Sequence, residues 1–342
     1  MRPGLTPGQG PAAPLVSIMI PTYGQAGLVC RAIDSARAQT YPHLDIVVAD
    51  DCSPDDTAHV VRAHLASIQD PRVRYHRHPS NLGILRNYHE TLFTLAQGEW
   101  VVNLDGDDLF VDPTFIERAM ALGARDGRIN LITANYCELA EPGHRRMDIV
   151  NRGLPEVMAS ADFLSRFASG QIYWNHNAIV YRRADALEHG CYWHPTEPRN
   201  DWESFLRIVA VGKVGHVPLV AAAWVQHGAN ETRRLDMAKY LNNFRLIDGV
   251  ARFAQAHGHG AGFVSAWRTR MFVKSAASSA GAYAKQGDLR GLLSFLWRLR
   301  ALSLGAACRT LVSPGLWGRL VLSRHPALYD WVKGRLRGRV HG

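Results

Sequence analysis

The sequence is poor in cysteine and has no long run of apolar residues. Five cysteines are scattered over 342 residues without a C-x-x-C pair, which favours reduced thiols over a disulfide framework or a zinc site. The longest apolar run, Val217 to Val225, contains Pro218 and is far too short to cross a bilayer. The residues before Leu15 are rich in Pro and Gly, so no signal peptide is expected. We expect a cytoplasmic protein, or one bound peripherally at the inner face of the plasma membrane.

Acidic residues are nearly absent from the last quarter of the chain. From Ala261 onward there are 14 Lys and Arg and only two acids, a net charge of +12, whereas the preceding part has a net charge of −3. A mildly acidic body with a basic tail indicates a catalytic unit joined to a region that meets an anionic surface. No recognition motif for nucleic acid is present, so no nucleic-acid partner is expected.

Apolar runs and amphipathic stretches alternate over the first third of the chain. The apolar runs predict strands at 16–20, 44–49, 73–76 and 100–104. The amphipathic stretches between them predict helices at 28–39, 57–68 and 85–96. This alternation is typical of right-handed parallel units, whose strands all end at the same edge of the sheet. The sequence therefore predicts an α/β fold.

Polar side chains follow three of these strands. They are Thr22 and Tyr23, Asp50 and Asp51, and the segment from Asp105 to Asp108. We expect them to converge at the edge where open α/β sheets bind ligands.

The segment from Asp105 to Asp108 has three carboxylates in four positions. Such crowding raises their pKa values unless a positive partner is present, and Mg²⁺ or Mn²⁺ suits carboxylate oxygens. Taken alone, an Asp/Gly-rich segment is more often a solvated turn. An EF-hand does not fit, because the twelfth position from Asp105 is Ile116 rather than Glu. A dinucleotide fold is poorly supported, since no G-x-G-x-x-G follows the first strand.

Six segments, in order and with matching spacing, resemble glycosyltransferase family 2. They are V-S-I-M-I-P-T-Y, A-Q-T-Y-P, V-A-D-D-C-S, N-L-G, G-E and L-D-G-D-D, at 16–23, 38–42, 48–53, 81–83, 98–99 and 104–108. The resemblance runs from about Val16 to about Thr232. It implies the GT-A fold, which is Rossmann-like, with a mostly parallel sheet flanked by helices. It also implies inverting transfer of a sugar from a nucleotide diphosphate sugar, with Mg²⁺ or Mn²⁺ as cofactor.

The resemblance assigns the first two strand ends to the nucleotide. Asp51 would contact the base and Asp50 would support it, while Tyr23 would offer its ring face to the base or simply pack. Arg86 would bind the diphosphate, since a guanidinium matches phosphate geometry; an ordinary surface arginine is the alternative. Further residues assigned to substrate binding are Pro21, Thr22, Asn81 and Gly83.

The acidic cluster and the second half are assigned to metal and catalysis. Asp105 would contact the ribose, and Asp107 and Asp108 the metal, although the extra Asp leaves the register open. His227 would complete the metal site, with a structural histidine as the alternative.

Asp201, at the start of a predicted helix, would be the catalytic base, or else only the helix cap. Glu203 is the alternative base. Further residues assigned to substrate binding, with packing as the alternative for the aromatic side chains, are Trp174, His176 and Trp202.

After about Leu235 the pattern becomes helical, at 240–257, 264–286 and 288–304, followed by a basic stretch from Leu316 to Arg339. These helices would lie on an anionic membrane or form a bundle with a solvated basic face. The expected organisation is a disordered arm (1–14), a GT-A domain (15–235) and a basic helical region (236–342).

The expected activity is metal-dependent inverting glycosyl transfer to a glycan or lipid-linked glycan, with a UDP-sugar favoured as donor, in cell-surface polysaccharide biosynthesis. The alternatives are a nucleotidyltransferase and a catalytically inactive scaffold that binds sugar nucleotides.

Overall fold

The structure is a computed structural model that describes residues 13–140, 145–196, 199–227, 236–313 and 316–317. It divides into two compact units, residues 1–164 with 172–229 and residues 165–171 with 230–342. Most of the arm expected over 1–14 and most of the basic stretch expected over 316–339 lie outside the described residues. The domain boundary that we expect after residue 235 comes at the end of the segment 228–235. This segment also lies outside the described residues. These three expectations stay predictions.

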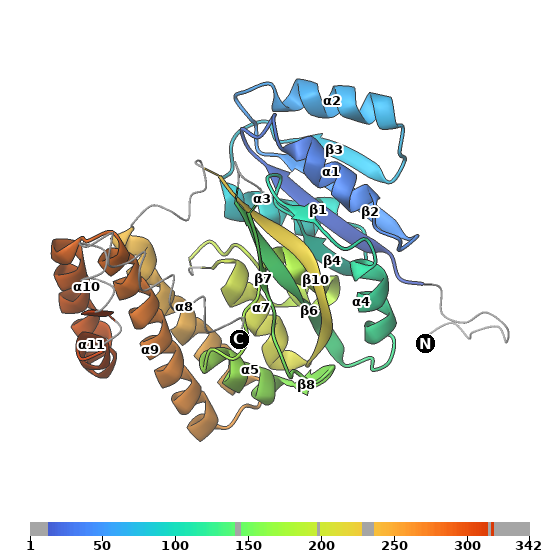
Figure 1. The fold of residues 1–342 in the computed structure, drawn as a ribbon. Coiled ribbons are helices and arrows are strands. Elements are labelled where there is room, and N and C mark those ends of the chain that lie inside the picture. Colours follow the sequence, from blue (N-terminus) through green and yellow to red (C-terminus); the bar gives the residue numbers. More distant parts are fainter. Residues whose placement is uncertain (1–12, 141–144, 197–198, 228–235, 314–315, 318–342) are drawn as a thin grey trace, which may run out of the picture. The chain divides into compact units, whose positions relative to one another are not determined.

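The first part of the first unit is a parallel sheet. Its strands run in the order β3-β2-β1-β4 (Figure 1), with bounds β1 Val16–Thr22, β2 Leu44–Asp50, β3 Val73–Arg77 and β4 Trp100–Asn103. Every residue of β1, β2 and β4 is buried, as expected of strands covered on both faces. The four predicted strands are confirmed, and the three polar motifs follow adjacent strands.

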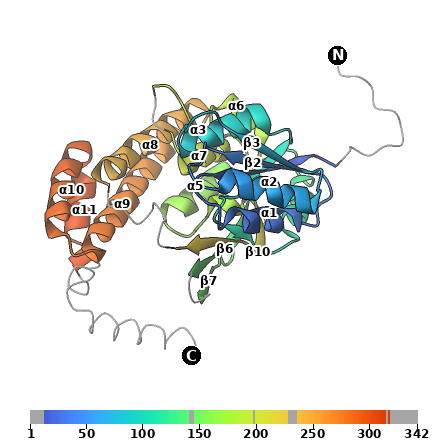
Figure 2. The ribbon, with the colours of Figure 1, turned by 90° about the horizontal axis from the view of Figure 1, so that it is seen from above.

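Helices cover both faces of this parallel part. Figure 2 shows α1 (Val29–Arg37) and α2 (Thr57–Ile68) on one face and α3 (Ile84–Glu90) on the other. The buried residues of α1 follow helical spacing, at Val29, Ala32, Ile33 and Ala36. The single helix predicted over 85–96 is instead α3 followed by a π-helical turn, Thr91–Leu95.

The second part of the first unit extends the sheet with mixed strand directions. The order continues β4-β9-β6-β10-β5; β9 is antiparallel to β4 and β6, while β6 and β10 are parallel. The strands are β5 Leu109–Phe110, β6 Ile129–Ala140, β7 Arg145–Ile149, β8 Val157–Ala159, β9 Ile179–Arg182 and β10 Lys213–Gln226. The helices are α4 Phe115–Gly123, α5 Ser160–Ala168, η2 His176–Ala178, α6 Arg183–Glu188 and α7 Asp201–Val211.

The second unit is helical where it is described. It contains α8 Met237–Ala256, α9 Ala261–Lys285, α10 Leu289–Leu302 and α11 Leu304–Leu311 (Figure 1), which confirms the three predicted helices. Aromatic contacts hold the helices together: the Phe244 and Phe272 rings meet edge-on at 5.0 Å, and Tyr283 stacks on Phe295. Within the described part of the chain, no helix is both long and apolar enough to cross a membrane.

Candidate active site

The backbone itself joins the three polar motifs. Thr22 lies opposite Asp50 in the sheet register, and its carbonyl accepts a hydrogen bond of 2.9 Å from the Asp51 N–H. The Gly106 N–H donates to the Pro21 carbonyl at 3.1 Å. A Cβ at Gly106 would lie 2.4 Å from Gln25 Oε1 and 2.9 Å from Thr22 Oγ1. A side chain at residue 106 would therefore require Gln25 and Thr22 to shift at the end of β1.

The two carboxylates after β2 are buried and held from different sides. Asp51 accepts hydrogen bonds from the Leu82 and Gly83 N–H groups at 2.7 and 2.9 Å. Asp50 accepts from the Tyr75 hydroxyl at 2.6 Å and from the Ser53 N–H at 2.8 Å. Asp51 thus fixes the turn after β3 to the end of β2. Its oxygens keep further acceptor capacity for a ligand N–H.

Three further residues assigned to the nucleotide surround this turn. Tyr23 is 50% exposed, so one face of its ring is open for stacking. The Asn81 side chain accepts from the Gly83 N–H at 3.0 Å and shapes the turn. Arg86 is exposed, and its guanidinium lies over the Trp193 ring, 5.0 Å from the centroid. This contact orients the Arg86 guanidinium.

His176 joins the acidic cluster to the proposed base. Its Nε2 lies 2.7 Å from Asp105 Oδ2 and its Nδ1 lies 3.4 Å from Asp201 Oδ2. Burial alone would lower the pKa of His176. The negative charges of Asp105 and Asp201, together with their hydrogen bonds to the imidazole, instead raise this pKa well above its ordinary value. In return, burial opposes ionisation of both carboxylates, yet His176 holds the pKa of each below its ordinary value. The two carboxylates on either side of His176 therefore favour its protonated form.

The other two acids of the cluster have separate partners. His227 Nε2 lies 2.8 Å from Asp107 Oδ2. Asp108 is 2% exposed and accepts from the Val225 N–H at 2.7 Å and from Asn177 Nδ2 at 2.5 Å. Burial and the neighbouring carboxylates raise the pKa of Asp107, and raise that of Asp108 well above its ordinary value. Asp108 thus ties the cluster to β10 and η2.

The cluster fits a divalent cation. Repulsion and burial disfavour its negative charge, and a cation would relieve both. Donor atoms of Asp105, Asp108 and His176 lie within 4.8 Å of one another. Each Asp108 oxygen accepts one hydrogen bond and, like the Asp51 oxygens, keeps further acceptor capacity. His176 contacts a carboxylate through each of its nitrogens, which disfavours it as a ligand. The chemistry of the donor set therefore favours Asp107, Asp108 and His227.

Asp201 is the more accessible of the two candidate bases. It is the first residue of α7, and the N-cap is Asn200, whose side chain accepts from the Glu203 N–H at 2.9 Å. The interpretation of Asp201 as the cap is therefore wrong. The Asp201 side chain is 39% exposed. Glu203 is 1% exposed and pairs with Arg199 at 3.6 Å and with Arg207, so its carboxylate has a structural role.

The two tryptophans assigned to substrate binding are both partly buried but differ in their contacts. Trp174 contacts the rings of Phe163 and Phe205 at 5.7 and 6.0 Å, which favours the packing alternative. Trp202 is partly exposed in the first turn of α7, next to Asp201.

Several residues that support the site were missed in the sequence. The Tyr88 hydroxyl donates to Asp105, and the Tyr88 ring stacks on Tyr192 at 5.1 Å. Tyr192, fully buried, accepts from the Asn103 side chain at 2.9 Å. Asn177 accepts from the Asp105 N–H at 3.0 Å and donates to Asp108. The only signal for Asn177 was its place beside His176, and nothing local marked Tyr88.

This geometry agrees with what comparisons with known proteins find. The model of a family described as glycosyl transferase family 2 matches residues 17–187, half of the chain. The chain belongs to glycosyl transferase family 2. The family 2 match covers β1 to β4, the acidic cluster and His176, whereas Asp201 and His227 lie beyond it.

Relatives of this family 2 chain include polysaccharide enzymes. It is 27% identical over 243 residues to a chondroitin synthase of Escherichia coli, covering 69% of this chain and 32% of that protein. It is 38% identical over 122 residues to the succinoglycan biosynthesis protein ExoO of Rhizobium meliloti, covering 34% and 33%. The chain spans about a third of the length of the chondroitin synthase.

Solved structures establish the GT-A fold. S. aureus TarS 1-349 in complex with UDP-GlcNAc superposes with a TM-score of 0.60 at 15% identity, covering 84% of this chain and 83% of that one. The mannosyltransferase PcManGT of Pyrobaculum calidifontis, in complex with GDP-Man and Mn²⁺, gives 0.53 at 20% identity, covering 94% and 88%. At these identities the likeness concerns the fold alone.

Proposed function

We propose that this chain transfers a sugar, with inversion, from a nucleoside diphosphate sugar to a hydroxyl group of a glycan. The observation that carries the proposal is the link from Asp105 through His176 to Asp201. It joins the acidic cluster to an exposed carboxylate, and the two contacts of His176 are 2.7 and 3.4 Å. A donor site and a base at this spacing are what a single in-line displacement needs. The family match favours this activity over a nucleotidyltransferase.

The donor would bind along the ends of β1, β2 and β4. Asp51 would accept from the base, the exposed face of Tyr23 would stack on it, and Asp105 would accept from the ribose. Arg86 would meet the diphosphate with its planar fork. The GDP-Man and UDP-GlcNAc in the two solved structures support a nucleoside diphosphate as the ligand class. A preference for uridine remains a prediction from the sequence.

Asp107, Asp108 and His227 are the residues that would hold Mg²⁺ or Mn²⁺, and the hydrogen bonds of Asp108 to Val225 and Asn177 would keep the loop in position. A divalent cation there would neutralise the charge that develops on the departing diphosphate. The Mn²⁺ in the PcManGT structure supports the use of a divalent cation.

Asp201 would take the proton from the acceptor hydroxyl as the sugar carbon inverts. Its 39% exposed side chain leaves room for an acceptor, and His176 holds it in one orientation. Because the pKa of Asp201 lies below its ordinary value, the carboxylate is ionised and ready to accept at neutral pH. An ionised, accessible carboxylate at this position favours catalysis over the catalytically inactive scaffold.

The polysaccharide relatives support a glycan acceptor, free or lipid-linked, in cell-surface polysaccharide biosynthesis. A peripheral contact with an anionic membrane would bring a lipid-linked acceptor close. The second unit supports such a contact, since Trp297 and Leu304 are 64% and 65% exposed on helices that also carry exposed arginines. A cytoplasmic location remains a prediction from the cysteine pattern.

The test is a turnover screen of UDP-, GDP- and dTDP-sugars with oligosaccharide acceptors and Mn²⁺. NMR of the product should show the anomeric configuration inverted relative to the donor, and the Asp201→Asn variant should form product at least about 100-fold more slowly. A retained configuration would contradict the mechanism. Release of pyrophosphate would favour the nucleotidyltransferase instead. Equal turnover by Asp201→Asn would remove Asp201 as the base.

A further inference from the structure

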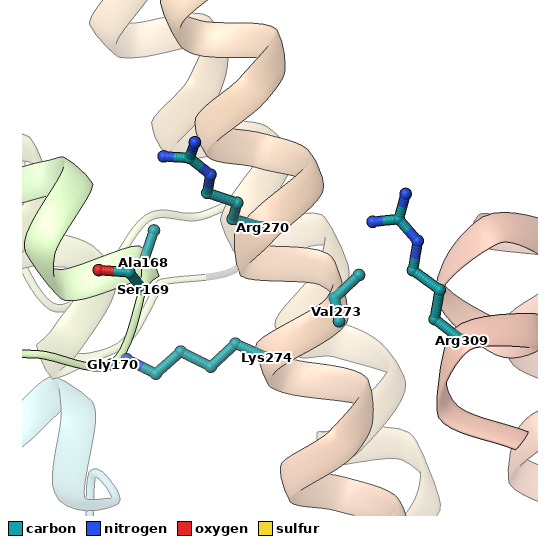
Figure 3. Close-up of a pocket in the computed structure, with 7 residues that line it drawn as sticks. All are labelled: Ala168, Ser169, Gly170, Arg270, Val273, Lys274 and Arg309. Carbon is teal, nitrogen blue, oxygen red and sulfur yellow. The ribbon is translucent and has the colours of Figure 1, made fainter. Parts of the chain in front are cut away.

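The second unit contains a basic pocket of its own. A cavity of about 290 Å³ is lined by the turn at the end of α5 and by residues of α9 and α11: Ala168, Ser169, Gly170, Arg270, Val273, Lys274 and Arg309 (Figure 3). Its volume is close to the lower end of the range for small-molecule sites, roughly 300–1,000 Å³. All of its lining residues belong to the second unit, and no acid is among them.

The three cations of this pocket come together at an energetic cost. Arg270 and Lys274 are four residues apart on α9, so they share one face of the helix, and like charges at this spacing repel. Arg309 adds a third charge from α11, which packs against α9. An arrangement that gathers like charges around a cavity is stabilised when an anion enters.

The two arginines keep their donors for a ligand. Neither the Arg270 nor the Arg309 guanidinium has an ion-pair partner among the residues that the structure describes. Other arginines of the unit are occupied: Arg268 pairs with Asp248 at 2.5 Å, and Arg300 stacks on Trp297 at 3.3 Å. A guanidinium presents a planar fork that matches the oxygens of a phosphate group.

Lys274 is already oriented toward the turn. Its Nζ donates to the Phe167 carbonyl at 2.5 Å and lies 4.1 Å from the centre of the Phe167 ring. An ammonium has three N–H donors, so two remain for a ligand. Burial lowers the pKa of Lys274 to about 8, which a bound anion would reverse.

We propose that Arg270, Lys274 and Arg309 form a binding site for a phosphate group, separate from the donor site of the first unit. The phosphate group belongs either to a soluble phosphate or diphosphate or to the headgroup of a lipid, and the same donors serve both sources. The site would anchor a phosphorylated ligand on the second unit while the first unit carries out transfer.

The experiment measures binding to the full chain, with inorganic phosphate and pyrophosphate by calorimetry and with vesicles of phosphatidylglycerol or phosphatidylcholine by sedimentation. The pocket variant is Arg270→Gln with Arg309→Gln. The control variant, Arg245→Gln with Arg252→Gln, removes the same charge from exposed positions of α8 outside the pocket and outside the helices that carry Trp297 and Leu304. Thermal unfolding of both variants checks that they fold.

We expect the pocket variant to lose at least about tenfold in affinity and the control less than about twofold. Saturable binding of pyrophosphate, lost in the pocket variant, identifies a soluble source. Binding only to phosphatidylglycerol vesicles, lost in the same variant, identifies a headgroup. Equal losses of affinity in the two variants would mean that binding depends on overall positive charge rather than on the pocket, and would overturn the proposal. The proposal would also be overturned if the wild type bound none of the probes. If the pocket variant fails to fold, Lys274→Met replaces it against the same control.

Discussion

The Nδ1 atom of His176 lies 3.4 Å from Oδ2 of Asp201, and this contact connects the two halves of the proposed active site. Asp201 begins α7, whereas His176 lies in the short helix η2 that precedes β9. Through its other nitrogen, His176 also reaches Asp105 after β4. The His176 side chain therefore contacts both a donor-site carboxylate and the proposed base.

The first prediction concerns Asp201 itself. Asp201→Asn keeps the shape of the side chain but removes its basicity, so kcat should fall by about 10²–10⁴-fold while the dissociation constant of the nucleotide stays within about threefold. Steady-state kinetics and calorimetry measure the two quantities. Asp34→Asn, at an exposed position of α1, is the control and should leave both unchanged. An Asp201→Asn enzyme with normal kcat would contradict the assignment.

His176 should act through Asp201 rather than beside it. His176→Gln removes the charge that orients the base, and we expect kcat to fall by about tenfold or more. Because the two residues would act as one unit, the double variant with Asp201→Asn should be no slower than Asp201→Asn alone. Multiplicative losses in the double-mutant cycle would mean that His176 works independently, for example on the donor only.

Gly106 should be intolerant of a side chain. In Gly106→Ala the new Cβ would lie within 3 Å of Gln25 and Thr22, and we expect the free energy of unfolding to fall by about 1–3 kcal/mol with weaker nucleotide binding. Gly127→Ala, where nothing lies within 4 Å of the added Cβ, is the matched control. If urea unfolding gives the same free energy of unfolding for both variants, the space between the acidic cluster and β1 accommodates a Cβ and the prediction is wrong.

Lys274 should make the stability of the second unit depend on pH. Burial lowers its pKa from 10.5 to about 8, so between these values the unfolded chain binds the proton that the folded chain releases. Stability should therefore rise with pH across this window, by at most about 1.4 kcal/mol per pH unit. In Lys274→Met the free energy of unfolding should differ less between about pH 8 and about pH 10 than it does in the wild type. Urea unfolding in phosphate-free buffer at these two pH values measures the difference. Parallel curves for wild type and variant would contradict the burial of this amine.

The sequence predicted the parallel part of the fold well, for a physical reason. β1, β2 and β4 are buried on both faces, so each is mostly apolar, with Ser17 and Asp45 as interruptions in β1 and β2, and each ends at its polar motif. The later strands were harder to recognise: β6 and β10 mix polar with apolar residues, and β10 contains Pro218 together with register irregularities. Their pairing depends on partners more than 80 residues away along the chain, which no local pattern encodes.

The candidate site was predicted as a set of residues but not as a network. Asp105, Asp107, Asp201 and His227 were identified through the family resemblance, whereas the bridging role of His176 was not, because its two partners come from other elements. Asp201 and Glu203 were hard to tell apart by spacing. Only the burial of Glu203 between two arginines separates them.

The most direct test of the account is calorimetric binding of UDP, GDP and dTDP, with and without Mn²⁺, to the wild type and to Asp107→Ala with His227→Ala. Asp34→Ala serves as the control for lost charge. We predict that one nucleotide binds at least about tenfold more tightly with Mn²⁺, and that the double variant loses this gain while the control keeps it. Nucleotide affinity that is unchanged by Mn²⁺ and by the double variant would contradict the metal assignment. If the wild type binds none of the three nucleotides, the proposed function is contradicted.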